Sequence, residues 1–115
     1  MSAIERDDIK RLIEALRDNV RSGKKRDLSR KLLKLVDVPA RRRISVNLYK
    51  LDKLTHEGDS VIVPGKVLAD GSISHKLNIA ALEYSKGASV ALGNAGAKLG
   101  EIREMLETKN VKIIV

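Results

Sequence analysis

Apolar residues follow a helical period in the first third of the chain. They recur at steps of three and four and form one stripe, which consists of Ile9, Leu12, Ile13, Leu16 and Val20. This stripe predicts a helix over residues 3–21, and residues 2–5 have the spacing of a capping box at its start. A second helix is predicted over residues 25–35, between the Ser22-Gly23 break and Pro39, which disfavours helical geometry in the residue before it. The inward positions of this second helix are Leu28, Leu32, Leu35 and Val36.

A different pattern begins after Pro39. Alternating apolar residues over 44–48 predict a strand, and Leu48, Leu51 and Leu54 then take up helical spacing. A strand that passes into a short helix capped near Asn47 satisfies both patterns.

Residues 60–84 have the highest density of β-branched and aliphatic side chains, and the rest of the chain is organised around them. Pro64-Gly65 and Asp70-Gly71 punctuate this stretch, so it predicts three short strands joined by tight turns. The elements predicted after it are a helix over residues 86–92, a strand over 98–101, a helix over 102–108 and a strand over 111–115. Together these elements make a loose recurrence of strand, strand and helix.

Length and element order define the expected fold class. A chain of 115 residues is large enough for one core, so we expect a single domain over residues 1–115. Its class is α/β, with a helical and basic N-terminal part over residues 1–43 and an α/β body over residues 44–115. The core must be aliphatic, because the chain has no Phe or Trp and its two tyrosines are Tyr49 and Tyr84. Both tyrosines lie near predicted apolar positions.

Composition excludes several kinds of chemistry. The chain has no Cys, which rules out a disulfide framework, a thiolate metal site and a cysteine nucleophile. It also has no secretory leader pattern and no apolar run long enough to cross a bilayer. We therefore expect a soluble intracellular protein with no membrane partner.

The positive charge is concentrated in one segment. The formal net charge is +8, and residues 21–43 hold ten basic residues against two acidic ones, so this segment accounts for all of it. The flanking parts of the chain are nearly neutral. Because a solvated helix face normally mixes the two signs, the segment predicts a polyanionic partner.

Two parts of this segment arrange their cations in a regular way. Arg26, Arg30 and Lys34 recur at steps of four in the second predicted helix, with Lys31 beside them, as a row that could track a phosphate backbone. Residues 40–43 then read as a loop that contains three consecutive arginines. The candidate contacts in the segment are Lys24, Lys25, Arg26, Arg30, Lys31, Lys34, Arg41, Arg42 and Arg43.

Other candidate sites are weak. His56 and His75 are the only histidines, and neither has a second His or Cys at ligand spacing, so no metal site is predicted. Glu57 and Asp59 could be paired carboxylates, but they flank a turn glycine and are typical of a loop before a strand. No nucleophile, base and orienting group can be assembled, so we predict no catalytic residue and no cofactor.

Two glycine motifs also have simpler interpretations. Residues 64–67 are similar to the end of a phosphate-binding loop, but Ser60 stands where the first glycine belongs and Val67 where Ser or Thr belongs. Residues 93–96 match the GXXG of KH domains, and the C-terminal cap of a helix explains them equally well.

The scarcity of aromatic residues narrows the expected mode of binding. Proteins that read single strands by sequence usually stack bases on Phe, Tyr or Trp, and this chain offers two tyrosines. Recognition of backbone and shape by Arg and Lys is therefore favoured, with Arg suited to bidentate phosphate contacts.

Four motifs carry a family resemblance, and they occur in the same order over nearly the whole chain. They are PARRR at residues 39–43, VNLYKL at 46–51, EGDSVIVPGKVL at 57–68 and DG at 70–71. Together they resemble large ribosomal subunit protein eighteen-e of archaea and eukaryotes, a family related to bacterial large-subunit protein fifteen.

This resemblance implies a structural constituent of the large ribosomal subunit in the cytoplasm, without enzymatic activity. Its expected partners are large-subunit ribosomal RNA and neighbouring ribosomal proteins, and we expect a monomer that supports subunit assembly. The implied fold is an irregular superhelix of strand-strand-helix turns after two helices and a basic linker. Carried over to this sequence, the basic helix and linker become RNA contacts, and Lys66 and Lys76 become candidates of second rank.

Two other interpretations remain open at this stage. A small enzyme or protein-interaction module could use the basic segment on an acidic partner, and a deep pocket lined by His56, Glu57 and Asp59 would favour it. DNA binding by the first two helices is less favoured, because neither helix offers an evident set of base-reading side chains.

Overall fold

The structure is a computed structural model that describes residues 6–115, so the capping box expected at residues 2–5 lies outside the described part. The elements in chain order are α1 (Arg6–Ser22), α2 (Arg26–Val36), the one-turn 3-10 helix η1 (Ala40–Arg42), β1 (Ile44–Asn47), α3 (Leu48–Leu54), β2 (Ser60–Leu68), β3 (Asn78–Tyr84), α4 (Lys86–Asn94), β4 (Lys98–Gly100), α5 (Ile102–Met105) and β5 (Val111–Ile113). Two helices and a basic linker precede the strands, and this confirms the α/β class expected from the sequence.

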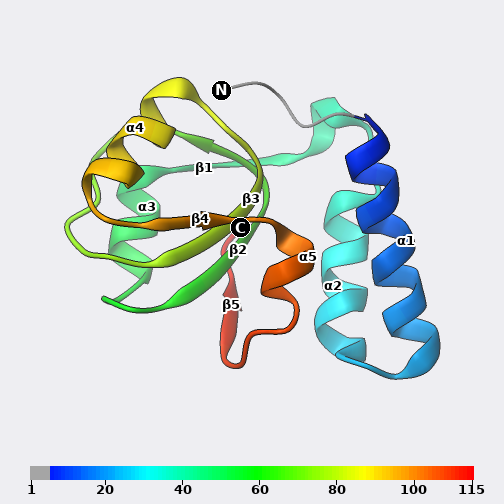
Figure 1. Ribbon diagram of the computed structural model, residues 1–115. Coiled ribbons are helices and arrows are strands. Elements are labelled where there is room, and N and C mark those ends of the chain that lie inside the picture. The colour runs from blue at the N-terminus through cyan, green and yellow to red at the C-terminus, as the bar shows by residue number, and fades with distance from the viewer. Residues whose placement is uncertain (1–5) are drawn as a thin grey trace.

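The five strands form one parallel sheet in the order β1-β2-β3-β4, with β5 paired to β2. β2 has partners along both sides. Its first three residues pair with β5, its last four pair with β1, and β3 follows its other side. Because parallel neighbours need a crossover connection, the chain winds around the sheet in successive turns, which gives the irregular superhelix (Figure 1).

The Pro64-Gly65 dipeptide does not separate two strands. β2 runs through it without a break, and the pairing with β3 shifts register between Val63 and Lys66. The central stretch therefore forms two strands, and the expected three strands are wrong. In Figure 1, β2 and β3 curve together through the middle of the molecule, so the dipeptide bends the ladder of strands.

Gly65 lets β1 approach this bend. A Cβ atom at this position would overlap the carbonyl oxygen of Ile44 and lie 2.7 Å from Ile44 Cγ1. Since Ile44 is the direct partner of Gly65 in the ladder, a side chain here would push β1 away from β2.

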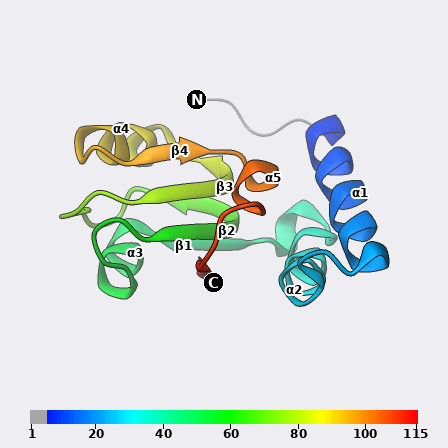
Figure 2. The same ribbon diagram turned by 60° about the horizontal axis from the view of Figure 1, so that its bottom comes forward.

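The sheet separates two hydrophobic clusters, and alternate strand residues supply them. Val61 and Val63 face the cluster that contains α3 and α4, whereas Ile62 faces the cluster that contains α1, α2 and α5. Figures 1 and 2 show the same division, with α1 and α2 side by side at one end and α3 and α4 at the other. The helical pair is thus fixed to the body through its own part of the core.

The apolar stripe of α1 faces this core as predicted, with Leu12 and Leu16 buried. In α2, Leu32 and Val36 are buried, but Leu28 and Leu35 are only half-buried and Ser29 is buried in their place. Asn19 Nδ2 donates to the Ser29 hydroxyl at 3.3 Å, which gives the serine a partner on α1.

Candidate nucleic-acid interface

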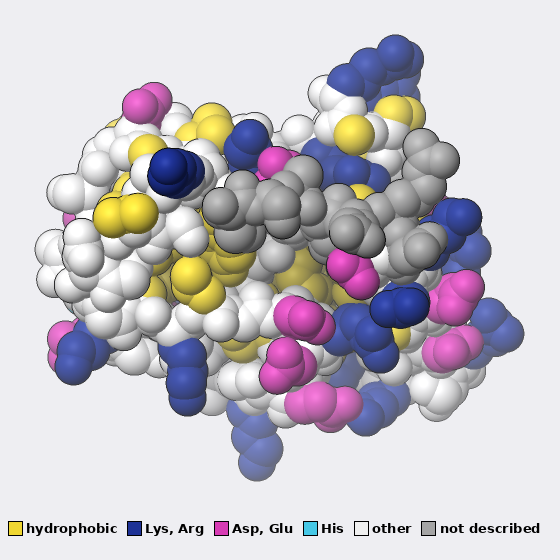
Figure 3. All heavy atoms as spheres, turned by 45° about the horizontal axis from the view of Figure 1, so that its top comes forward, with side chains coloured by type: hydrophobic (Ala, Val, Ile, Leu, Met, Phe, Trp, Pro, Cys, Tyr) yellow, Lys and Arg dark blue, Asp and Glu magenta, His cyan; other side chains and the backbone are white. Residues whose placement is uncertain are grey.

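The basic segment, residues 21–43, covers the end of α1, the turn after it, α2 and η1. Nine of its ten basic side chains are exposed, and Arg43 is half-buried. In Figure 3, Lys and Arg side chains gather over this helical part, while they are scattered over the α/β body. Because α2 is 11 residues long, the cations extend over about 16 Å from the α1–α2 turn to η1.

The turn between α1 and α2 is fixed by backbone geometry. Gly23 has a φ of 85° and Lys25 a φ of 51°, so two residues of the turn adopt the left-handed conformation. The Arg26 Nε–H donates to the Val20 carbonyl at 3.1 Å, which holds this side chain against the end of α1.

The outer face of α2 carries its cations without neutralising carboxylates. Among residues 8–115, no carboxylate lies within 4.0 Å of the charged groups of Arg30, Lys31 or Lys34, and the same holds for Arg41 and Arg42. Asp37, one of the two acidic residues of the segment, pairs with Arg17 of α1 at 3.2 Å. The face therefore presents several charges that only water or a bound anion can balance.

Lys24 is the exception within the turn. Its Nζ lies 2.8 Å from Glu107 Oε1, and both side chains are more than half exposed. The hydrogen bond from Lys24 is the main reason why the pKa of Glu107 lies below its usual value. A phosphate at Lys24 must therefore compete with this carboxylate.

The three consecutive arginines differ from one another. The expected loop at residues 40–43 contains the single 3-10 turn η1, closed by the Arg42 N–H that donates to the Pro39 carbonyl at 2.8 Å. Arg41 and Arg42 are exposed, whereas the Arg43 Nε–H donates to the Val36 carbonyl at 3.4 Å. Arg43 thus helps to cap α2, and Arg41 and Arg42 are free for a ligand.

Lys66 and Lys76 belong to the α/β body and not to the basic segment. Lys66 is in β2 and pairs with Glu83 of β3 at 3.6 Å. Lys76 is in the β2–β3 loop, where its side chain packs beside Gly96. The structure therefore brings together the nine candidates of the basic segment and places the two of second rank on the body.

The interpretation as an enzyme gains no support from His56, Glu57 and Asp59. His56 and Glu57 are exposed, and Asp59 accepts the His56 backbone N–H at 2.8 Å and binds Lys112 Nζ at 2.9 Å. These contacts lower the pKa of Asp59, the bond from His56 most strongly. Asp59 therefore stabilises the turn before β2 and ties it to β5.

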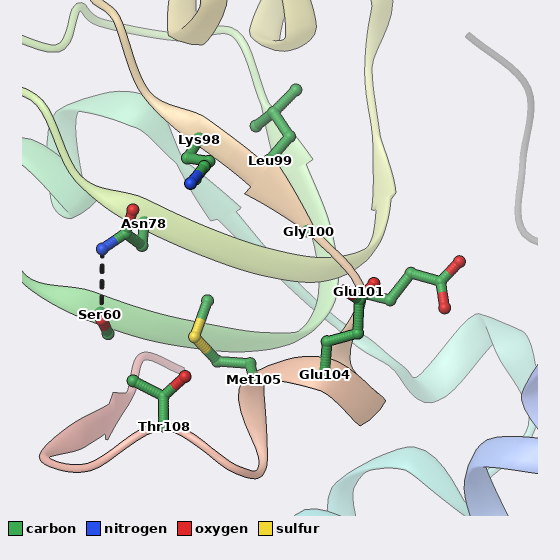
Figure 4. A pocket seen from close by; sticks show the side chains of 9 residues that line it. All are labelled: Ser60, Asn78, Lys98, Leu99, Gly100, Glu101, Glu104, Met105 and Thr108. Carbon is green, nitrogen blue, oxygen red and sulfur yellow. Dashed lines mark hydrogen bonds between the residues drawn. The ribbon is translucent and has the colours of Figure 1, made fainter.

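A pocket of about 450 Å³ lies at the starts of β2, β3 and β4. His56, Glu57 and Asp59 do not line it. Figure 4 shows that Ser60 and Asn78 of the strands and Met105 and Glu104 of α5 surround it. It is open to solvent and contains no set of nucleophile and base. Among the residues described, no three metal-binding side chains converge.

An arrangement that the sequence did not suggest connects Asp52, His75 and Thr55. His75 Nδ1 lies 3.4 Å from Asp52 Oδ1, and His75 Nε2 lies 2.7 Å from Thr55 Oγ1. The order of groups is that of a catalytic triad, but Thr55 is buried and its hydroxyl donates to the Leu51 carbonyl at 2.6 Å. The hydroxyl is therefore unable to attack a substrate, and the three residues fasten the end of α3 to the β2–β3 loop.

The glycine motif at residues 93–96 ends a helix. Gly96 has a φ of 80°, and the Ala97 N–H donates to the Leu92 carbonyl at 2.9 Å while the Gly96 N–H donates to that of Gly93 at 3.1 Å. These bonds close the last turn of α4, as expected for a helix cap.

No helix within residues 6–115 has the length and apolar character needed to cross a bilayer.

A small α/β protein that displays a row of uncompensated cations is typical of proteins that bind nucleic acid. No family model matches the chain. Several curated proteins are similar to it, and the three described here are each named large ribosomal subunit protein eL18. The relative from Sulfurisphaera tokodaii is 33% identical over 92% of this chain and 89% of its own length. The relative from Thermoplasma volcanium is 35% identical over 93% of this chain and 87% of its own length. The relative from Methanothermobacter thermautotrophicus is 37% identical over 77% of this chain and 74% of its own length.

The class is therefore that of archaeal-type ribosomal proteins of the large subunit, which act in translation and are located in the ribosome, in the cytoplasm. Within this class the chain belongs to the family of large ribosomal subunit protein eL18. The resemblance inferred from the sequence motifs is confirmed.

Proposed function

We propose that this protein is a structural constituent of the large ribosomal subunit that binds large-subunit ribosomal RNA and supports subunit assembly, without catalytic activity. Residues 1–43 form its RNA-binding part, and residues 44–115 form the body that fixes this part in place. The protein acts as a monomer within the particle, beside neighbouring ribosomal proteins. Binding uses phosphate and shape contacts.

One observation carries the proposal. The exposed cations of α2 and η1 have no carboxylate partner within the described residues, although surface side chains of opposite sign usually lie near one another. A phosphate backbone supplies the missing negative charge, and Arg binds phosphate with two parallel hydrogen bonds. The proposed contacts of the basic segment are Lys24, Lys25, Arg26, Arg30, Lys31, Lys34, Arg41, Arg42 and Arg43, with Lys66 and Lys76 in second rank.

The test removes two charges from the segment and two from elsewhere. The variant Arg41→Ala/Arg42→Ala leaves Arg43 in place to cap α2, and Lys86→Ala/Lys109→Ala removes two exposed cations of the body. Binding to an in vitro transcript of archaeal large-subunit ribosomal RNA is measured from low to moderate salt.

We expect the arginine variant to lose about tenfold in affinity at moderate salt and to reduce the slope of log K against log salt by about two units. The lysine variant should change both quantities much less. An equal loss in the two variants would show that affinity follows net charge alone, and would contradict a specific role for the segment.

A further inference from the structure

Tyr49 is a large aromatic side chain that the fold leaves in solvent. Its exposed fraction is 62%, the highest among the large hydrophobic residues that the structure describes, whereas Tyr84 is 7% exposed. Both tyrosines lie near apolar positions as expected, but only Tyr84 is buried with them. In a chain with two aromatic residues, one ring is therefore available for an external contact.

The backbone under this ring is rigid. Leu48 and Leu51, on the opposite side of α3, are fully buried, and the Tyr49 N–H donates to the Asp70 carbonyl at 3.0 Å. Gly71 has a φ of 98° and approaches so closely that a Cβ atom there would lie 2.6 Å from Tyr49 N. The ring is thus presented from a fixed point, as a binding group on a rigid element should be.

One exposed cation lies beside the ring. Lys53 is exposed one helical turn after Tyr49, with no carboxylate within 4.0 Å among residues 8–115. The Asp52 carboxylate is bonded to the β2–β3 loop, where it accepts from the Ser74 hydroxyl and backbone N–H at 2.7 and 2.9 Å. Asp70, in the β2–β3 loop, is the other acidic residue near Tyr49. Its backbone carbonyl accepts the Tyr49 N–H.

The helix that carries the ring is connected to the proposed RNA-binding segment by β1. β1 leads directly from the arginines of η1 to α3, and its four residues with their flanks span about 16 Å at 3.3 Å per residue. Figure 1 shows η1 and α3 at the two ends of β1. One RNA segment can therefore contact both.

We propose that Tyr49 is a stacking platform for one unpaired RNA base, with Lys53 binding the phosphate of that nucleotide. This inference rests on the proposed RNA binding and adds a contact of a different kind, since stacking on a π face differs from phosphate neutralisation by the basic segment. Because every base has a π face, the contact selects a flipped-out nucleotide and is tolerant of its identity.

The first test compares three variants on the same ribosomal RNA transcript. Tyr49→Phe keeps a stacking ring, Tyr49→Leu keeps an apolar side chain without one, and Tyr49→Ala removes both. We expect Tyr49→Phe to bind as the unmodified protein does, and the Leu and Ala variants to lose about 5- to 150-fold in affinity with little change in salt slope. Circular dichroism checks that all three fold.

The second test is ultraviolet crosslinking of the same complex, followed by trypsin and mass spectrometry. Cleavage after Arg43 and Lys50 gives the peptide of residues 44–50, whose one aromatic residue is Tyr49, and Tyr84 falls in the peptide of residues 77–86. We expect a nucleotide adduct on the first peptide and none on the second. The Tyr49→Leu variant should lose the adduct.

The possible failures are distinguishable. Tight, salt-dependent RNA binding that is equal in all three variants, with no adduct, overturns the stacking platform and leaves the proposed function intact. Absence of RNA binding by the unmodified protein overturns both. If Tyr49→Ala binds RNA normally but enters large subunits poorly in cells, the ring contacts a neighbouring protein, and the inference is wrong.

Discussion

Lys24 and Glu107 lie 83 positions apart in the chain, and their charged groups are 2.8 Å apart in the structure. The pair joins the turn between α1 and α2 to the segment after α5. It therefore links the basic segment to the body at a point where neither partner is buried.

Removal of this carboxylate should release Lys24 for RNA. We expect Glu107→Gln to raise affinity for ribosomal RNA at low salt and to increase the salt slope by about one unit, because one more cation exchanges its partner for phosphate. The pair is exposed, so thermal stability should change little. The control is Glu104→Gln, which removes the same charge from a residue with no ion pair among those described. Equal gains in the two variants would indicate a general charge effect.

Acidification should weaken the fold through three carboxylates. The pKa of Asp52 is lowered mainly by the Ser74 hydroxyl, that of Asp59 by the His56 N–H, and that of Glu107 by Lys24. A carboxyl whose pKa is lower in the folded state stabilises the fold above its unfolded pKa, and this contribution disappears as the pH falls through the folded value. We expect denaturant midpoints to be constant near neutral pH and to decrease below about pH 4.

The matched variant for this pH dependence is Asp59→Asn. It should have a lower midpoint at neutral pH and a shallower decrease on acidification, because one linked group is gone. A decrease as steep as that of the unmodified protein would exclude Asp59 as a contributor.

Two glycines should respond to alanine in opposite ways. In Gly65→Ala the new methyl group overlaps the Ile44 carbonyl, so we expect a loss of about 1–3 kcal/mol in the free energy of unfolding. Gly93 is in α4, and a Cβ atom there meets no heavy atom within 4 Å. Gly93→Ala should therefore be neutral or stabilising by up to about 1 kcal/mol, through its helix propensity. Urea unfolding measures both, and similar losses would contradict the close approach of β1.

Burial of Tyr84 should be visible at high pH. Its surroundings disfavour the charged phenolate, so burial raises the pKa to about 12, and the neutral hydroxyl donates to the Ile79 carbonyl at 3.3 Å. The pH dependence of stability has the opposite sign to that of the carboxylates. The contribution of Tyr84 to stability is complete below the pKa of tyrosine in the unfolded chain and is lost as the pH rises through its pKa in the folded state. In the Tyr49→Phe variant, we expect phenolate absorbance to appear only near pH 12. A titration near the ordinary value of 10.0 would show that Tyr84 is exposed.

The sequence predicts those parts of the fold that depend on neighbouring residues. The stripe of α1, with Leu12 and Leu16 buried, follows from helical spacing, and the end of α4 follows from Gly96. Pro64-Gly65 was predicted to be a turn between two strands, because this dipeptide is typical of turns. In the structure, pairing with β1 on one side and β3 on the other keeps it within β2. Such partners come from distant parts of the chain, and no local pattern reveals them.

The candidate interface was predictable to a similar extent. Charge density alone located the basic segment, because nothing near it in sequence neutralises it. The candidate RNA contacts differ in how free their side chains are, and the sequence did not show this. Lys24 is bonded to Glu107, Arg43 to Val36 and Lys66 to Glu83. The exposure of Tyr49 was also hidden, because it is adjacent to the apolar positions of α3.

Because β5 pairs with the start of β2, the sheet can form fully only after the last residues of the chain have been synthesised. Residues 111–113 occupy the side of β2 at Ser60, Val61 and Ile62 that no other described strand covers. During synthesis this side is an open edge until those residues have emerged, and an open edge of apolar sequence invites pairing with other chains. The +8 of residues 21–43 is present from an early stage, and mutual repulsion keeps unfinished copies apart. The charge that we propose for RNA binding thus also disfavours close contact between two copies whose β2 edge is still open.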